Sequence, residues 1–532
     1  MRKKFLLLLL FLKNFSAEKV CFCLLFFLTL FTALPLSGES KKVCSFRIIQ
    51  TTDIHGQYSN FSAPGISSLA FVVKKAMEEK GKENTLYIDC GDILQGTYES
   101  AYDRGKMMIP YLNSTFCEVF VPGNHDLEFG TENFLKTFLN YRGKILSCNL
   151  RPHEKEGVPA IFSYAFFRKG GADIAVIGMS PRFLQSWFSP KDLQGIIQKN
   201  AARELNKLMP LIMKRKPHFI ILAMHEGEYR NTLKEGKQEK GFLSRLFRQY
   251  PQIDLVLGGH THMVSEGKKC YQNQWYVQAP PLAAGAAVVD VIIDAATGKK
   301  LSLRSEIRYS SREKTDPETG KLFAPVLQET EKAGKERLGY LPFAPRPVGK
   351  SLKKAAGNPF AVLMGKVLRE AAGTPLAFHG TMGNYQCHAG FLTQRRLFLL
   401  LPYENRISTI PVTKEECRRI LEEQIKNVRY GNFQQPSGVK YTYKNGKVTG
   451  LTAEANPVWD KESMPCAFTS YALSGAGGRF PVLASIASKK AHLRKDLSLT
   501  VREAAKEYIR KNMGKSSFRK NTSRQKKHNK NH

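Results

Sequence analysis

Short β-rich runs alternate with helical patterns between Ser45 and about Ile307, and this alternation restricts the chain to few folds. The β-rich runs are FRIIQTT, NTLYIDC, EVFVP, ADIAVIGM, HFIILAM and IDLVLGG. The helical stretches include SSLAFVVKKAMEEK and AARELNKLMPLIMKRK. Strands and helices in turn predict an α/β architecture in which the loops gather at one edge of the sheet.

The length of 532 residues exceeds what one hydrophobic core usually organises, so we expect two domains with terminal extensions. The alternating pattern assigns residues 45–310 to the first domain. A charged segment punctuated by Pro and Gly follows at 311–350, and its helical stretch APVLQETEKAG indicates an interdomain linker with a helix. A second α/β or α+β pattern occupies 351–512, followed by a basic tail at 513–532.

Residues 1–38 have the composition of an export signal. A basic start, MRKK, precedes the apolar runs FLLLLLFL and VCFCLLFFLTLFTALPL and the small residues of SGES. We therefore expect a periplasmic, cell-surface or secreted protein. The alternative is an uncleaved N-terminal anchor, although the second run of about 17 residues is short for a spanning helix.

The formal net charge of +35 has one concentrated source in the basic tail. A tail of this kind either associates weakly with anionic surfaces or remains a solvated, disordered terminus. No aromatic or structural context of a nucleic-acid-binding module accompanies the charge, so we expect no stable nucleic-acid partner. The oligomeric state stays open at this stage.

Five of the β-rich runs end in residue types that bind metals. The segments are TTDIHG, DCGDILQG, PGNHD, LAMHEGE and GGHTH, which supply Asp53, His55, Asp92, Asn124, His125, Asp126, His225, His260 and His262. Imidazoles, carboxylates and an amide oxygen suit divalent Zn, Mn, Fe or Co, and the set contains no thiolate of the kind common in structural zinc sites. The two residues of each Asp-x-His or His-x-His pair are expected to share a side of the chain. The polar residues of any one such segment more often have a structural role, but the five segments together predict a metal centre.

In this order and context, the five segments resemble those of the calcineurin-like metallophosphoesterases. With the second domain, the chain resembles the 5'-nucleotidase family, which includes 2',3'-cyclic-nucleotide 2'-phosphodiesterases with 3'-nucleotidase activity. The resemblance covers most of residues 46–485 and implies a four-layer αββα domain followed by a smaller α/β nucleotide-binding domain. It also implies two divalent metal ions. One would be bound by Asp53, His55, the bridging Asp92 and His262, and the other by Asp92, Asn124, His225 and His260.

The same resemblance implies that His125 stabilises the transferring phosphoryl group or protonates the leaving group. In the family, an acid three residues beyond this histidine orients it, and here that residue is Glu128. Because Glu128 is one methylene longer than the usual aspartate, Asp126 is the second candidate for this role.

In the second domain, the segments GNFQQPSGVKYTY and SYALSGAGGRFPV resemble those that supply the two base-stacking rings. Phe433 and Phe480 are the matching aromatics, and Asn405 in LPYENRI is a candidate base or ribose contact. Two segments depart from the family pattern. FHGTMGNYQ lacks the arginine that many 5'-nucleotidases carry there, and GAGGRF has Arg479 in place of a small residue.

Three functions remain after this comparison. The first is an exported dimetal phosphohydrolase that releases phosphate from nucleotides, in the manner of a 5'-nucleotidase. The second is a 2',3'-cyclic-nucleotide 2'-phosphodiesterase/3'-nucleotidase, which the stretch SPRFLQSWFSPKDLQG with Trp187 favours. The third is a catalytically silent nucleotide- or surface-binding protein, which the complete ligand set disfavours.

Overall fold

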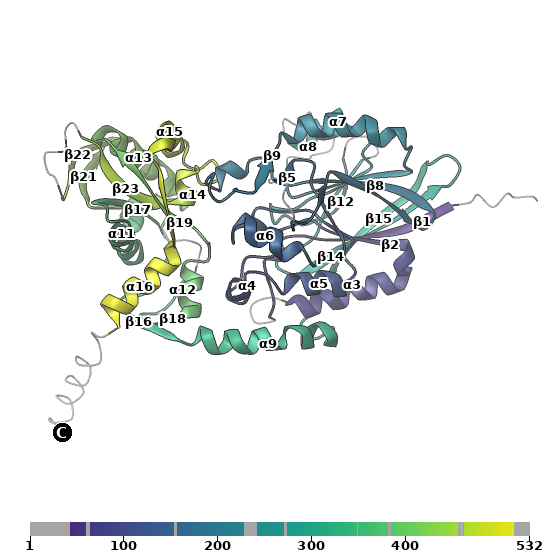
Figure 1. Ribbon diagram of the computed structural model, residues 1–532, viewed down its shortest axis with the longest axis horizontal. Coiled ribbons are helices and arrows are strands. Elements are labelled where there is room, and N and C mark those ends of the chain that lie inside the picture. The colour runs from purple at the N-terminus through teal and green to yellow at the C-terminus, as the bar shows by residue number, and fades with distance from the viewer. Residues whose placement is uncertain are drawn as a thin grey trace, which may run out of the picture.

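A computed structural model describes residues 43–59, 64–153, 157–227, 242–270, 274–347, 349–380, 385–455, 459 and 462–514. Figure 1 shows two α/β parts of unequal size side by side, with helix α9 along one side of the molecule. The export signal expected at 1–38 and nearly all of the basic tail lie outside the described residues. Among the residues described, no helix combines the length and the apolar character needed to cross a bilayer.

The larger part contains two sheets. The first has the strand order β15-β14-β1-β2-β3-β4-β6, with β14 and β15 antiparallel and the rest parallel. Its strands are β1 (Val43–Thr51), β2 (Thr85–Asp89), β3 (Val119–Phe120), β4 (Lys144–Leu146), β6 (Ile161–Phe162), β14 (Gly285–Asp294) and β15 (Lys300–Tyr309). The antiparallel β14 and β15 therefore form one edge.

The second sheet has the order β12-β13-β11-β10-β8-β7, with a parallel centre and an antiparallel strand at each edge. Its strands are β7 (Tyr164–Lys169), β8 (Ala172–Met179), β10 (Phe219–Met224), β11 (Leu255–Leu257), β12 (Ser265–Lys269) and β13 (Trp275–Gln278). The parallel strands therefore lie at the centre of the second sheet, whereas in the first sheet they extend from β1 to the edge strand β6.

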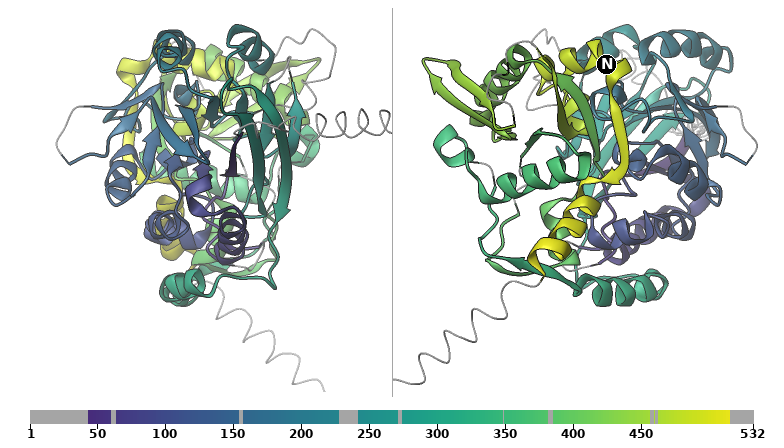
Figure 2. Two further views of the ribbon diagram at one scale, coloured as in Figure 1. Left: turned by 90° about the vertical axis from the view of Figure 1, so that its right-hand side faces the viewer. Right: turned by 60° about the vertical axis from the view of Figure 1, so that its left-hand side comes forward.

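The two sheets pack face to face on an apolar core. Phe46 and Ile48 of β1 point into this core toward Phe219 and Ile221 of β10, whereas the alternate residue Ile49 points to the outer side. Helices cover both outer faces, with α3 (Ile66–Lys80), α5 (Met108–Ser114) and α6 (Thr131–Phe138) on one and α7 (Ala201–Lys214) and α8 (Phe242–Gln249) on the other. Figure 2 shows these outer helices in two further views. The expected four-layer αββα arrangement is confirmed.

The smaller part is a three-layer sandwich around a sheet of order β20-β17-β23-β19-β24. Its strands are β17 (Leu376–His379), β19 (Arg406–Val412), β20 (Gln435–Ser437), β23 (Met464–Thr469) and β24 (Lys495–Thr500). Helices α11 (Pro359–Ala372) and α16 (Val501–Met513) cover one face, and α13 (Lys414–Asn427) and α15 (Pro481–Lys489) cover the other. The smaller second α/β domain is thus present.

Shorter elements complete the chain. They are α4 (Tyr98–Asp103), α10 (Leu352–Ala355), α12 (Gln394–Leu400), α14 (Ser470–Leu473), and the strand pairs β5 (Leu150–Pro152) with β9 (Ile196–Gln198), β16 (Arg337–Leu341) with β18 (Gly390–Thr393), and β21 (Val439–Lys444) with β22 (Lys447–Ala453). Single 3-10 turns lie at Lys82–Asn84, His125–Leu127, Leu184–Ser186, Val428–Tyr430 and Ala491–Leu493.

Helix α9 (Pro317–Gly334) joins the two parts. It begins before the expected stretch because the Asp316 side chain accepts the backbone N–H of Thr319 and caps it, with proline in the first turn. Phe323 is buried against the larger part, with its ring centroid 4.8 Å from that of Tyr58. After α9 the chain enters β16, which pairs with β18 of the smaller part. The connector is therefore attached to both parts.

We predict that Phe323→Ala destabilises the larger part by about 3 kcal/mol, because it removes a fully buried ring and leaves a cavity under α9. Urea unfolding followed by tryptophan fluorescence measures the loss. Phe116→Ala is the matched control, since that ring is 46% exposed, and it is expected to change stability by less than about 0.5 kcal/mol. Equal losses in the two variants would contradict the anchoring role of Phe323.

Candidate active site

Seven side chains of the expected metal centre lie at the carboxyl ends of five strands drawn from both sheets. Asp53 and His55 follow β1, Asp92 follows β2, Asn124 follows β3, His225 follows β10, and His260 and His262 follow β11. Because the parallel strands of the two packed sheets end at the same side of the domain, residues up to 209 positions apart in the chain meet there. The structure brings the predicted set together.

The candidate ligand atoms form overlapping groups. Those of Asp53, His55 and His262 lie within 4.8 Å of one another, as do those of Asp92, His225 and His260. The Nε2 atoms of His55 and His262 are 3.0 Å apart, and His225 Nε2 lies 2.9 Å from Asp92 Oδ2 and 3.8 Å from Asp53 Oδ1. The groups are therefore parts of one continuous cluster.

The chemistry of the cluster fits divalent cations. Asn124 is buried, and its Oδ1 atom has no hydrogen-bond partner among the described residues. A buried acceptor without a donor is costly unless a ligand satisfies it. Together with two fully buried carboxylates and neighbouring imidazoles, this amide oxygen gives the nitrogen and oxygen donor set that Zn, Mn, Fe and Co accept.

The backbone of this cluster is unusual. Asp53, His55, Asp92, His260 and His262 all have positive φ angles, between 52° and 70°. Left-handed backbone is disfavoured for residues other than glycine and concentrates at functional sites. Hydrogen bonds maintain it here: Asp53 N–H donates to Gly91 O, and His260 N–H donates to both Asp53 carboxylate oxygens.

These turns correct one expectation. The side chains of Asp53 and His55 were expected to point to the same side because residues two positions apart in an extended strand share a face. However, β1 ends at Thr51, and both Asp53 and His55 lie in left-handed turns beyond it. Their side chains converge because of these turns rather than because of strand alternation.

Burial and mutual charge set the protonation of the histidines. Burial, reinforced by His125 near His55 and by His225 near His260, lowers the pKa of each of these two imidazoles to about 4. They are therefore neutral at physiological pH, the form in which a ring nitrogen coordinates a metal. For His225, burial acts in the same direction, but the Asp92 carboxylate outweighs it and raises the pKa to about 10.

His125 contacts Glu128 and not Asp126. His125 Nδ1 lies 2.7 Å from Glu128 Oε1, and the imidazole is 22% exposed. Although burial lowers the pKa of His125, Glu128 and Asp92 raise it more strongly, to about 9, so the ring carries a proton at neutral pH. The longer side chain of Glu128 spans the distance from a position three residues along the chain.

Asp126 has a different set of contacts. Its carboxylate accepts the backbone N–H groups of Asp92, Ile93, Leu94 and Gly123 at 2.8–3.0 Å. It thereby ties the loop after β2 to the loop after β3. A Cβ atom at Gly123 would lie 2.1 Å from Asp92 Oδ1, so only glycine fits where these loops cross. Asp126 supports the loops that present Asp92 and Asn124.

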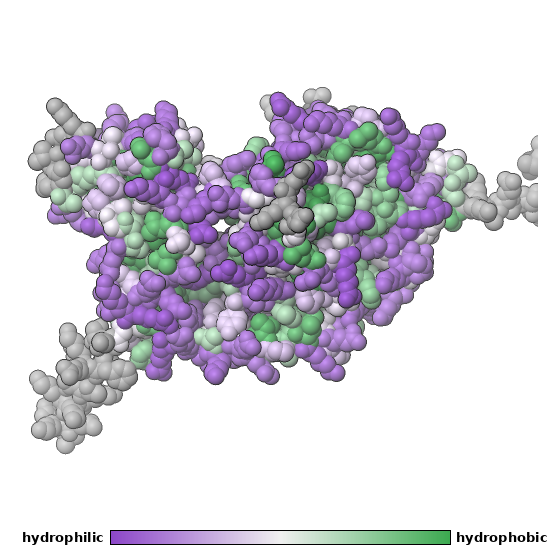
Figure 3. Space-filling model, in the orientation of Figure 1, coloured by the Kyte–Doolittle hydropathy of each residue, from purple (hydrophilic) through white to green (hydrophobic). Residues whose placement is uncertain are grey.

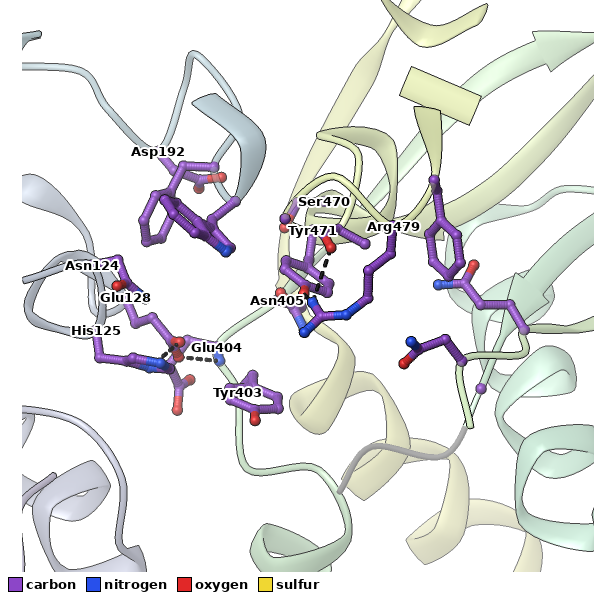
Figure 4. A pocket seen from close by; sticks show the side chains of 18 of the residues that line it. Asn124, His125, Glu128, Asp192, Tyr403, Glu404, Asn405, Ser470, Tyr471 and Arg479 are labelled. Carbon is purple, nitrogen blue, oxygen red and sulfur yellow. Dashed lines mark hydrogen bonds and ion pairs between the residues drawn. The ribbon is translucent and has the colours of Figure 1, made fainter. Parts of the chain in front are cut away.

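A cavity of about 490 Å³ opens next to this cluster, between the two parts. Asn124, His125, Glu128 and His260 line it from the larger part. From the smaller part the predicted substrate residues Phe433, Phe480 and Asn405 line the same cavity. Both phenylalanines also pack in the core of the smaller part, so each combines a structural position with an edge in the cavity. In Figure 4, Asn405 appears with Tyr471 and Arg479, and Asn124 and His125 appear at the other side of the view.

Sequence reasoning missed several residues of the cavity wall, namely Tyr403, Glu404, Tyr471 and Asp192. The ring centroid of Tyr403 is 6.0 Å from that of His125. Glu404 N–H donates to Glu128 Oε2 at 3.3 Å. The only available signal was position: Tyr403 and Glu404 lie beside Asn405 in LPYENRI, whereas Tyr471 lies in SYALSGAGGRFPV and Asp192 in SPRFLQSWFSPKDLQG.

Contacts between the parts fix both walls of the cavity. Gln95 Nε2 donates to Pro402 O at 2.6 Å, Arg406 Nε lies 3.0 Å from Asp192 Oδ1, and Arg395 pairs with Glu99. Figure 3 shows mainly hydrophilic residues around the gap between the parts on this face. The segment from Pro402 to Arg406 thus lies directly against the loops of the metal-ligand cluster.

Comparison with known proteins agrees with this architecture. The sequence pattern of the calcineurin-like phosphoesterases matches residues 46–264, and that of the 5'-nucleotidase C-terminal domain matches residues 344–485. Among solved structures, a putative 5'-nucleotidase from Staphylococcus aureus superposes with a TM-score of 0.72 at 17% sequence identity. The match covers 89% of this chain and 98% of that one, which establishes a common fold.

Curated relatives match over shorter stretches. The chain is 26% identical over 239 residues to a 5'-nucleotidase of Vibrio cholerae, which covers 43% of this chain and 42% of the relative. It is 24% identical over 291 residues to Protein UshA of Yersinia enterocolitica, which covers 52% of each. The chain thus spans about half the length of these relatives. From the two matching domains and the shared fold, the chain belongs to the 5'-nucleotidase family of calcineurin-like phosphoesterases.

Proposed function

We propose that this protein is a metal-dependent phosphohydrolase that releases phosphate from nucleotides, most simply as a 5'-nucleotidase. One observation carries the proposal: the strand-end ligand cluster and the aromatic pair Phe433 and Phe480 open into the same cavity. A nucleotide has a phosphate at one end and a flat base at the other. The cavity offers a site suited to each.

We assign two divalent ions to the cluster, held by Asp53, His55, Asp92 and His262 and by Asp92, Asn124, His225 and His260. When bound, such ions stabilise phosphoryl charge as Lewis acids and activate water as the nucleophile. Attack of water on phosphorus breaks the bond to the leaving oxygen and yields phosphate and an alcohol. The carboxylates, imidazoles and amide oxygen of the cluster would hold these ions, and the positive charge of the ions would attract the reacting phosphate.

His125 acts on the phosphate from the cavity side. As an imidazolium beside Glu128, it stabilises negative charge on the transferring phosphoryl group or donates its proton to the leaving oxygen. Its backbone N–H also donates to Asp92 Oδ1 at 2.7 Å, which keeps it close to the cluster. Glu128 positions this histidine, whereas Asp126 maintains the loops.

A second function is favoured by Trp187, which lines the cavity with its ring centroid 5.3 Å from that of His260. The stretch around Trp187 resembles the 2',3'-cyclic-nucleotide 2'-phosphodiesterase/3'-nucleotidase branch. In that case the same cluster would hydrolyse 2',3'-cyclic nucleotides and 3'-nucleotides. An indole beside a ligand histidine narrows the approach to the metals and so influences which phosphate reaches them.

We also propose that the protein is exported, because residues 1–38 have a basic start and two apolar runs before a stretch of small residues. Mass spectrometry of the mature protein from its native cell tests this proposal. A mature chain that retains the whole leader would contradict signal cleavage and favour the anchor.

We predict metal-dependent release of phosphate from AMP. Protein treated with chelator and then supplied with Mn or Zn is assayed side by side with AMP, 3'-AMP and 2',3'-cyclic AMP. Turnover of AMP only after metal addition is the expected result. Activity confined to the other two substrates would select the second function, and nucleotide binding without any hydrolysis would support a catalytically silent protein.

We predict that His125→Ala lowers turnover at least about 10²-fold while metal content stays near normal, because His125 acts on the phosphate and is not a proposed ligand. Glu128→Gln should lower turnover about 10-fold without a change in melting temperature, since it removes only the charged partner of His125. Stopped assays with metal analysis measure both effects. Full activity in His125→Ala would exclude it from the mechanism.

Asp126→Asn provides the contrast to Glu128→Gln. An amide has one acceptor oxygen for the four backbone N–H groups that Asp126 now serves. We therefore expect it to lower stability by about 1–3 kcal/mol, measured by thermal unfolding. A normal melting temperature together with lost activity would instead place Asp126, not Glu128, in the positioning role.

A further inference from the structure

Arg479 belongs neither to the metal-ligand cluster nor to the aromatic pair, so the proposed function does not yet give it a role. It lines the cavity, and it is the only lysine or arginine among the described residues that do so. The preceding turn has four consecutive left-handed residues, with φ angles of 96°, 52°, 64° and 87° from Gly475 to Gly478. Glycine adopts such angles readily, so three of these residues suit the turn, and only Ala476 is in a conformation that is uncommon for its type.

Contact with the larger part fixes this turn. Gly477 N–H donates to Ser186 O at 2.9 Å, and a Cβ atom at Gly477 would lie 2.9 Å from Trp187 Nε1. The turn therefore packs against the segment that carries Trp187, across the boundary between the parts. Arg479 follows directly, so its distance from the metal-ligand cluster is determined by this contact.

The guanidinium of Arg479 lacks a carboxylate partner among the described residues. Its Nη1 atom donates to Tyr471 Oη at 2.6 Å and to Ala476 O at 3.0 Å. The carboxylates of the cavity wall are all engaged: Glu128 with His125, Asp192 with Arg406, and Glu404 with Arg502. A cation that faces a substrate cavity without a counter-ion favours an anionic group of the ligand.

Figure 4 shows Arg479 and Tyr471 across the cavity from His125, Asn124 and Glu128. Arg479 lines the same cavity as the cluster residues Asn124 and His260 and as the aromatic pair Phe433 and Phe480. A nucleotide that fills this cavity between the cluster and the aromatic pair would therefore share it with the guanidinium. Its Nε and Nη2 groups make no hydrogen bond with described residues, which leaves a planar fork for phosphate oxygens.

A second, more open cavity of about 790 Å³ adjoins this site and shares Arg479 and Asn432 with it. Arg419 and Lys426 line it and have no carboxylate within ion-pair distance among the described residues. Its own acids are engaged, Glu422 with Arg418 and Glu423 with the backbone N–H groups of Val482 and Leu483. Positive potential thus extends outward from Arg479.

We infer that Arg479 is a specificity-determining residue that binds a second phosphate of the substrate, so that the preferred substrates are nucleotides carrying a phosphate beside the one cleaved. This inference rests on the proposed function and specifies its substrate class. The second phosphate has two sources, a phosphoanhydride chain such as that of ADP or a second ester on the ribose, as in adenosine 3',5'-bisphosphate. In ADP this group is the singly charged α-phosphate next to the cleaved phosphate, and in the bisphosphate it is a phosphomonoester; both present anionic phosphate oxygens to Arg479.

The test compares kcat/KM for ADP and adenosine 3',5'-bisphosphate, each divided by the value for AMP, in wild type, Arg479→Met and Arg479→Lys. We expect at least one ratio above one in wild type, a fall of that ratio by about 10- to 100-fold in Arg479→Met, and a smaller fall in Arg479→Lys, which keeps the charge but not the fork. Arg215→Met is the matched control, because this exposed arginine lies over the Phe166 ring and neither residue lines either cavity. It should leave every ratio unchanged.

The outcomes separate this inference from the proposed function. Dependence on Arg479 for ADP alone, or for the bisphosphate alone, supports it and identifies the source of the second phosphate. Equal losses for AMP and both two-phosphate substrates would overturn it, because Arg479 would then only shape the cavity. If wild type hydrolyses none of the three nucleotides, the binding of ADP and of AMP to chelator-treated protein is measured by calorimetry. Equal affinities for ADP and AMP, both in wild type and in Arg479→Met, would overturn the inference.

Discussion

The packing of two sheets through one apolar core is the constraint on which the rest of the structure depends. Phe46 and Ile48 on one sheet face Phe219 and Ile221 on the other, and this contact aligns the carboxyl ends of β1, β2, β3, β10 and β11. Buried carboxylates and left-handed turns are individually unfavourable in this place. They persist because the core beneath them is extensive and because the ligand loops hydrogen-bond to one another, as Asp126 does to four backbone groups.

The smaller domain completes the site by its position. Its Phe433, Phe480, Asn405 and Arg479 reach the cavity only because α9 is anchored by Phe323 and because Pro402 to Arg406 contacts the loops of the larger domain. The ligand residues at the strand ends and the aromatic and arginine residues of the cavity wall are thus on different domains. Substitutions in the smaller domain can therefore change the cavity wall without changing the ligand residues.

Local sequence patterns were sufficient to predict the fold class and to identify the candidate ligand residues. Strand runs such as ADIAVIGM and HFIILAM are strongly apolar because parallel strands are covered on both faces, so their continuous apolar character and short length identify them. Asp53, His55, His260 and His262 were recognisable because their residue types recur at strand ends. The reason offered for their convergence was wrong, since β1 ends before Asp53 and the backbone turns left-handed there.

The sequence by itself determined which elements form and which side chains carry metal-binding chemistry, because both depend on neighbours within a few residues. Only the tertiary structure decided that Glu128 rather than Asp126 contacts His125 and that Phe433 and Phe480 share a cavity with the ligand cluster. It also decided that Arg479 faces this cavity with no carboxylate partner in the part of the chain that the structure describes. These relations join residues from different loops and different domains. They depend on distances across the packed core, which no local pattern of residues encodes.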